Sequence, residues 1–182
     1  MKILSRAALR FVLLAGGAFS LMVGCEFAYG QSLDALSKSD QAGRKVWEKT
    51  PFAVRNALFI TGEPQGFGAY TPRSPGPFKA GEHMIVYAEP VAYGWKSVED
   101  DQYEFGVTAD LILKTAAGEP IIEKNNFGNI VFKSRAQNRE MFVKLNVNLT
   151  GVDPGDYLLD IRLHDAEAAE KTGMIELPIT LE

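Results

Sequence analysis

The chain has few of the residues on which most enzymes and metal proteins depend. Among its 182 residues are one cysteine and two histidines, His83 and His164. It has no HExxH, His-x-His or cysteine cluster with the spacing of metal ligands, and no Gly-x-Ser-x-Gly elbow. We expect both histidines to be ordinary strand or surface residues rather than catalytic bases. The sequence therefore predicts no cofactor, no resident metal and no enzymatic activity.

Positive charge is also scarce. The chain carries 19 Lys and Arg against 23 Asp and Glu, for a formal net charge of −4. Nucleic-acid binding needs clustered basic residues to neutralise phosphates, so we do not expect a nucleic-acid partner. The hydrophobic fraction of 46% is ordinary for a globular protein and too high for a disordered one.

Long apolar runs are missing as well. A spanning helix needs roughly 18–20 apolar residues, which no segment reaches, so no membrane span is predicted. A shorter uncharged run, Phe11 to Gly24, follows the basic residues Lys2, Arg6 and Arg10. This pattern predicts a secretory signal peptide over residues 1–30 and a protein exported to the periplasm or beyond.

Cys25 lies at the end of this segment, where two processing routes are open. Ala28-Tyr29-Gly30 has small residues at the positions that signal peptidase reads, which would release a chain starting at Gln31. Met22-Val23-Gly24-Cys25 instead resembles a bacterial lipobox, which would make Cys25 a lipid-anchored N-terminus. Under either route the folded domain has no disulfide.

Residues 31–52 are polar and predict a tether with a short helix. Ser39 or Asp40 could cap this helix, which would run to about Lys49 and stop before Pro51, with Trp47 as its anchor. The domain proper is expected over residues 53–182. Residues 62–81 are rich in glycine and proline and indicate a long loop or an irregular edge strand.

Strand patterns dominate from His83 onward, because apolar residues alternate with polar ones. The runs HMIVYAEP, YEFGVTADLILKT, EMFVKLNVNL, DYLLDIRLHD and MIELPITL each place one apolar face opposite one polar face. The run AVRNALFIT from Ala53 predicts a further strand, and PIIEK and GNIVFKS predict one or two shorter ones. About seven strands in all, without helices between them, predict an all-β fold: an antiparallel immunoglobulin-like β-sandwich.

The stretch "GVDPGDYLLDIRLHD", residues 151–165, predicts a specific corner of such a sandwich. Asp153, Gly155 and Tyr157 have the spacing of a tyrosine corner, in which the ring covers the core edge and its hydroxyl bonds to the backbone a few residues upstream. We therefore assign Tyr157 a role in stability.

Together with "FKAGEHMIVYAEP" (Phe78 to Pro90), this stretch resembles a pattern in uncharacterised secreted bacterial β-sandwich proteins of immunoglobulin or fibronectin type III kind. The resemblance covers roughly residues 53–182. It implies an immunoglobulin-like fold and an envelope location, and it brings no known activity.

One cluster is a candidate ligand site. Aromatic rings beside carboxylates are used to recognise carbohydrates and peptides, and they could equally cap the core. The candidate residues are Tyr87, Glu89, Tyr93, Trp95 and Tyr103. A second candidate, the acidic run Glu99-Asp100-Asp101, would be a calcium loop or, as we prefer, a solvated turn.

These observations favour an exported, non-enzymatic binding protein of the bacterial envelope, whose partner is a protein, glycan or peptide. Two alternatives stay open. One is a small periplasmic hydrolase acting through carboxylates such as Glu89 with Asp110 or Asp165, which would have to converge in a cleft. The other is a structural accessory domain of an envelope assembly.

Overall fold

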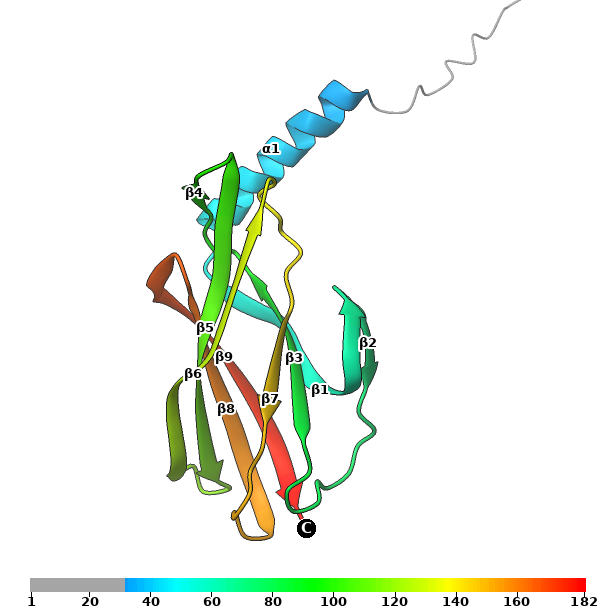
Figure 1. Cartoon of the computed structure of the whole chain (residues 1–182), viewed down its shortest axis with the longest axis vertical. Helices are drawn as coiled ribbons and strands as arrows, with labels where there is room; N and C mark the ends of the chain where they lie inside the picture. Colours follow the sequence, from blue (N-terminus) through cyan, green and yellow to red (C-terminus); the bar gives the residue numbers. More distant parts are fainter. Residues whose placement is uncertain (1–31) are drawn as a thin grey trace, which may run out of the picture.

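The computed structural model describes residues 32–182, so the predicted signal peptide and Cys25 lie outside the described residues. One helix, α1 (Leu33–Lys49), precedes nine strands in this part of the chain. The strands are β1 (Ala53–Gly66), β2 (Ala69–Pro72), β3 (Met84–Val91), β4 (Lys96–Val98), β5 (Gln102–Thr115), β6 (Pro120–Ser134), β7 (Val143–Val147), β8 (Gly155–Asp165) and β9 (Ala168–Leu181). The helix extends from one end of the strand assembly, and the C-terminus lies at the other (Figure 1).

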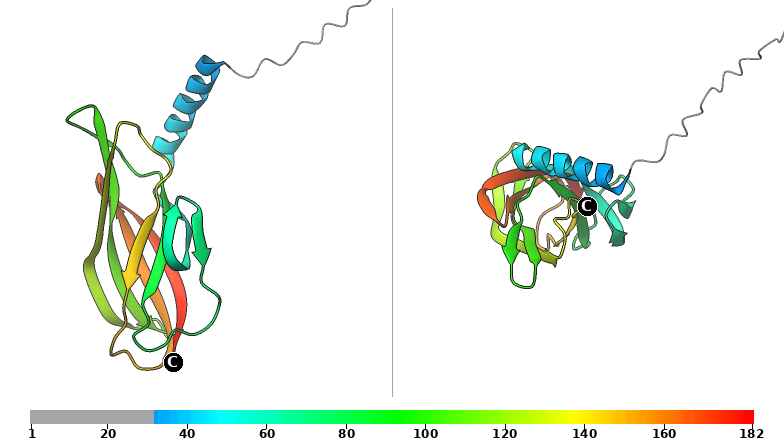
Figure 2. Two further views of the ribbon diagram at one scale, coloured as in Figure 1. Left: turned by 45° about the vertical axis from the view of Figure 1, so that its right-hand side comes forward. Right: turned by 90° about the horizontal axis from the view of Figure 1, so that it is seen from above.

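The strands form two antiparallel sheets. One sheet has the order β2-β1-β3-β7, and the other has the order β4-β5-β8-β9. Tyr103 of β5 pairs with Ser97 of β4 and also with Ser134 of β6, so β6 occupies the opposite edge of β5. The two layers pack face to face (Figure 2). This arrangement confirms the predicted all-β antiparallel sandwich, with β1, β3 and β7 facing β5, β8 and β9 in immunoglobulin-like order.

The core lies between the sheets and follows the alternation in the sequence. Val107, Ala109 and Leu113 of β5 have no exposed surface, and the same holds for Leu159 and Leu163 of β8. Successive side chains of a strand point to opposite faces, so these residues share the inner face while their neighbours face outward. Removing this apolar surface from water is the main source of stability of the fold.

The structure lengthens some of the predicted strands and adds others. The predicted strand from Ala53 continues to Gly66 and turns into β2, so part of residues 62–81 is an edge hairpin. The three-residue β4 is too short to show alternation. Residues 120–134 form one strand, β6, where one or two were predicted, and β9 begins at Ala168 rather than near Met174.

The N-terminal boundary of the helix was also predicted wrongly. Ser32 is the N-cap, because its side chain accepts from the amide of Ala35, whereas Ser39 and Asp40 lie inside α1. The C-terminal boundary at Lys49 is as predicted, since Thr50 precedes a proline and adopts an extended conformation. Within the described residues, no helix has the length and hydrophobicity needed to cross a membrane.

Tyr157 has the geometry of a tyrosine corner. It lies at the start of β8, and its hydroxyl donates to the carbonyl of Asp153 over 2.9 Å. Gly155 has a φ of +157°, and a Cβ at this position would lie 3.6 Å from the Tyr157 hydroxyl. The corner therefore fastens the connection that carries the chain from β7 in one sheet to β8 in the other.

Replacing Tyr157 with phenylalanine should destabilise the fold by about 1 kcal/mol, the net value of one hydrogen bond. The ring stays in place, so only this bond is lost. Chemical denaturation of both proteins measures the difference. Tyr103→Phe is a matched control, because Tyr103 is also half-buried and its hydroxyl bonds to none of the described residues. Equal effects of the two substitutions would contradict the structural role of Tyr157.

Candidate functional site

The five candidate ligand residues do not form one site. Tyr87 and Glu89 lie on the outer face of the first sheet, since their neighbours Val86 and Ala88 point into the core. Tyr93 and Trp95 follow β3, in the connection to β4. The sequence places these residues close together, but the alternation of β3 and the turn after it separate their side chains.

Tyr87 is enclosed although it faces away from the core. The tip of the β1–β2 hairpin covers it, and the amide of Gly68 donates to its hydroxyl over 2.8 Å. That hydroxyl in turn donates to Glu89 over 2.9 Å. Burial raises the pKa of Tyr87 to about 12. With none of its surface exposed, Tyr87 offers no ring face to a ligand.

Glu89 is likewise engaged. One carboxylate oxygen accepts from Tyr87, and the other accepts from Arg55 Nε and Nη2 at 3.2 and 3.0 Å. Only 6% of Glu89 is exposed. A carboxylate whose oxygens are both occupied by structural donors is poorly placed to act as a base or a nucleophile.

Tyr93 and Trp95 anchor the helix. The indole N–H of Trp47 in α1 donates to the carbonyl of Tyr93 over 2.9 Å, and the rings of Trp47 and Trp95 stack at 5.7 Å. The Tyr93 hydroxyl and the Trp95 indole both donate to the carbonyl of Asn138. Burial raises the pKa of Tyr93. This aromatic cluster closes one end of the sandwich, and Tyr103, half-buried in β5, belongs to neither group.

The other carboxylates that a hydrolase could use, those of Asp110 and Asp165, also accept hydrogen bonds from groups within the fold. Asp110 accepts from the amide of Asn126 over 2.9 Å and faces His164 Nε2 at 2.8 Å. Burial raises the pKa of Asp110, but the Asn126 amide and the His164 ring outweigh it, so the net pKa is lowered. His164 is therefore a partly buried residue of β8 whose ring is a partner of Asp110. The Asp165 carboxylate accepts from the amides of Gly94 and Glu167.

The acidic run is a hairpin turn. Asp100 and Asp101 have φ angles of 62° and 54°, which are the left-handed conformations of a tight β-turn between β4 and β5. Arg135 donates to the carbonyl of Asp100 over 2.8 Å. Within residues 32–182, no group of three or more His, Cys, Asp and Glu residues is arranged to hold a metal ion.

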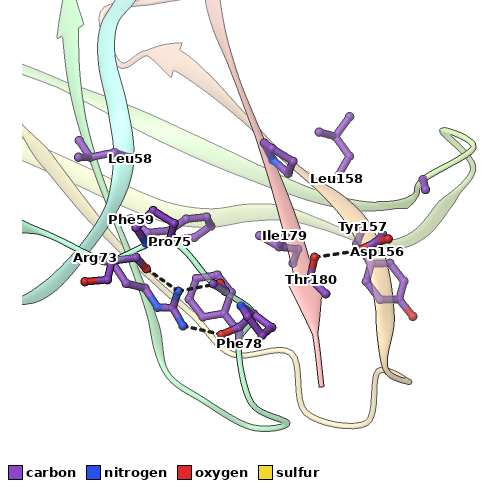
Figure 3. A pocket seen from close by; sticks show the side chains of 15 residues that line it. Leu58, Phe59, Arg73, Pro75, Phe78, Asp156, Tyr157, Leu158, Ile179 and Thr180 are labelled. Atoms are coloured by element: carbon purple, nitrogen blue, oxygen red, sulfur yellow. Dashed lines mark hydrogen bonds between the residues drawn. The ribbon is translucent and has the colours of Figure 1, made fainter.

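The structure reveals a cleft that the sequence did not predict. It has a volume of about 760 Å³ and lies where the edges of β1 and β9 meet, toward the C-terminal end of the sandwich (Figure 3). Its walls are mostly apolar and come from distant parts of the chain. They include Leu58, Phe59, Pro75, Pro77, Phe78, Tyr157, Leu158, Pro178 and Ile179.

Arg73 shapes one wall of this cleft. Its guanidinium donates to the carbonyls of Ser74, Gly76 and Pro77 and lies 3.7 Å from the centre of the Phe78 ring (Figure 3). The carboxylate of Glu82 accepts from Arg73 and from the amide of Lys79. The hydrogen bond from the Lys79 amide lowers the pKa of Glu82. Burial opposes this shift, and Arg73 adds to it. The proline-rich segment is thus a fixed wall rather than a loose loop.

Both strands beside the cleft have unpaired edges there. The pairing of β1 with β2 begins only at Ile60, and the amide of Arg73 donates to the carbonyl of Phe59, so this edge of β1 is open only before Phe59. The amide of Phe78 donates to the carbonyl of Thr180, so the outer edge of β9 is paired only near its end. Proline and glycine in residues 62–81 were the available signal, but they predict a turn and say nothing about which edges it joins.

Comparisons with known proteins show a partial similarity. No protein-family model matches the chain. Over 97 residues, 53% of the chain, it is 28% identical to tripeptidyl-peptidase 2 of Drosophila melanogaster. The matched stretch covers 6% of that protein, so the chain is similar to a small portion of a much longer polypeptide.

Proposed function

We propose that the protein is an exported, non-enzymatic binding module of the bacterial envelope, and that it holds an extended segment of a partner polypeptide in the cleft between β1 and β9. The observation that carries the proposal is the coincidence of an apolar cleft with the part of the β1 edge before Phe59, which pairs with no described strand on that side. Extended peptides bind at open sheet edges, where main-chain hydrogen bonds give affinity and side-chain pockets give specificity.

The polar groups around the cleft support binding rather than catalysis. Arg73 is held by backbone carbonyls, and Asp156 accepts from the Thr180 hydroxyl over 2.7 Å. Glu89, Asp110 and Asp165 are each engaged in contacts within the fold. The similarity to part of a peptidase therefore does not lead us to propose peptide hydrolysis.

The test is a screen of the purified protein against a display library of unstructured peptides, followed by affinity measurement on the enriched sequences. We expect enrichment of segments with apolar side chains, and at least about tenfold weaker binding when Leu58 or Leu158 is replaced by aspartate. Val46→Asp is the matched control, because Val46 is an exposed aliphatic residue (66%) on α1, which extends from the end of the sandwich opposite the C-terminus (Figure 1). Enrichment of no peptide, or equal binding by all variants, would contradict the proposal.

A further inference from the structure

β6 has an open edge over its second half. Its partner is β5, and among the described strands it pairs with no other. The amide of Ala166 donates to the carbonyl of Gly106, so the backbone groups of Gly106 point toward β8 and away from β6. Val131 lies opposite Gly106, and its own N–H and C=O therefore point away from β5.

Along β6 the backbone N–H and C=O groups of successive residues point alternately toward β5 and away from it. Asn129 and Lys133, two residues to either side of Val131, also point their backbone donors and acceptors outward, while Ile130 and Phe132 bond to β5. Val131 and Phe132 are 45% and 40% exposed, and Asn129 and Lys133 are exposed as well. This segment thus combines free backbone groups with exposed apolar side chains.

The outer strands β9, β2 and β7 are protected against edge pairing in ways that β6 is not. β9 carries Pro178, which has no N–H to donate, and Phe78 pairs with its end. β2 has only four residues. β7 is short and carries Lys144, which is paired with Glu63 of the hairpin. Natural proteins use proline, short strands and charge to prevent edge pairing, and the second half of β6 has only Lys133.

We infer that a second copy of this chain binds this edge, with the two β6 strands antiparallel about a two-fold axis at Val131. In this register Val131 faces Val131 of the second copy, and Asn129 faces Lys133. The three facing pairs would form about six main-chain hydrogen bonds, two for each pair. Phe132 would lie opposite Ile130 of the second copy, which removes its exposed ring from water.

The occupant is a second copy because the edge is complementary to itself. In an isologous interface only the residue on the two-fold axis lies opposite its own symmetry mate, so a charge at this central position would face the same charge. The central residue is the uncharged Val131. The ammonium of Lys133 would face an amide and has its counterion, Glu104, 3.5 Å away in its own copy. The surface is separate from the cleft, so the inference does not depend on the proposed function.

The test is analytical ultracentrifugation of the full purified protein over a dilution series. We expect a reversible monomer–dimer equilibrium that Val131→Lys weakens at least about 100-fold, because two ammonium groups would then face each other at the axis. Val46→Lys is the control, since Val46 is an exposed aliphatic side chain on α1 (66%), and it should leave the dimer intact. A protein that is monomeric at all concentrations, or a dimer that Val131→Lys does not weaken, would overturn the inference.

Cross-linking tests the register independently of affinity. Facing residues of a hydrogen-bonded antiparallel pair have Cα atoms about 5.5 Å apart. In a Cys25→Ser background, Val131→Cys should therefore be joined between copies by a short bifunctional thiol reagent. Ile121→Cys, exposed on the same strand but distant from the axis, should not. Preferential cross-linking at position 121 would overturn the two-fold axis at Val131.

Discussion

Gly106→Ala should destabilise the protein by about 3 kcal/mol, because the added methyl group has no space and no flexible neighbour. A Cβ at this position would lie 2.1 Å from the carbonyl oxygen of Ile130 and 2.8 Å from the Cα of Val131. Both atoms belong to the backbone of β6, so relief requires movement of a strand. Thermal unfolding should show a melting temperature lower by about 6–12 °C.

The response should be local as well as global. β5 is held by β8 on its other edge, whereas β6 is an edge strand and can yield. The exchange of backbone amide hydrogens in Gly106→Ala should therefore accelerate most in residues 128–134. Gly66→Ala is the control. Nothing lies within 4 Å of the position that the added methyl group would take, and the φ of Gly66 is not positive. This substitution should therefore be neutral or slightly stabilising. Similar stabilities for the two variants would show that β6 accommodates the methyl group, contrary to the expectation.

Much of the fold could be predicted because a strand with one buried face shows this in the alternation of its own residues. The alternation in β5, β7 and β8 reports one buried face, and that signal is local in sequence. Tyr157 could be assigned for the same reason, since its hydroxyl partner is four residues away. β6 was harder to define because even the inner face of its second half is only partly buried: Ile130 is half-buried and Phe132 is exposed, so the pattern GNIVFKS carries no clean alternation.

The site could not be predicted, because it depends on which edges meet. Leu58 and Leu158 line one cleft although they are far apart in the chain, and no spacing rule relates them. The candidate cluster around Tyr87 and Trp95 failed for the opposite reason. Neighbours in sequence were expected to be neighbours in space, but the alternation of β3 and the docking of Trp47 bury them in separate structural groups.

Asp165→Asn should also have a large effect, a destabilisation of about 2–3 kcal/mol. Asp165 has no exposed surface, and its two oxygens accept from the amides of Gly94 and Glu167 at 2.8 and 3.0 Å. Asparagine has the same shape but only one acceptor oxygen. In either orientation its NH₂ group would face a partly buried backbone N–H, which loses a charge-assisted bond and leaves a donor unpaired.

Asp156→Asn is the matched control, because Asp156 is exposed and, among the described residues, its carboxylate accepts only from the Thr180 hydroxyl, a bond that an amide oxygen can also accept. The Asp165 variant should also loosen the end of the sandwich where Trp47 donates to the residue before Gly94. Trp47 and Trp95 are the two tryptophans of the chain, so their fluorescence should change before global unfolding in Asp165→Asn and not in Asp156→Asn. If Asp165 were a catalytic residue, Asp165→Asn would behave in the opposite way: the protein would keep its full stability and lose a hydrolytic activity. That result would favour the carboxylate hydrolase over a binding module.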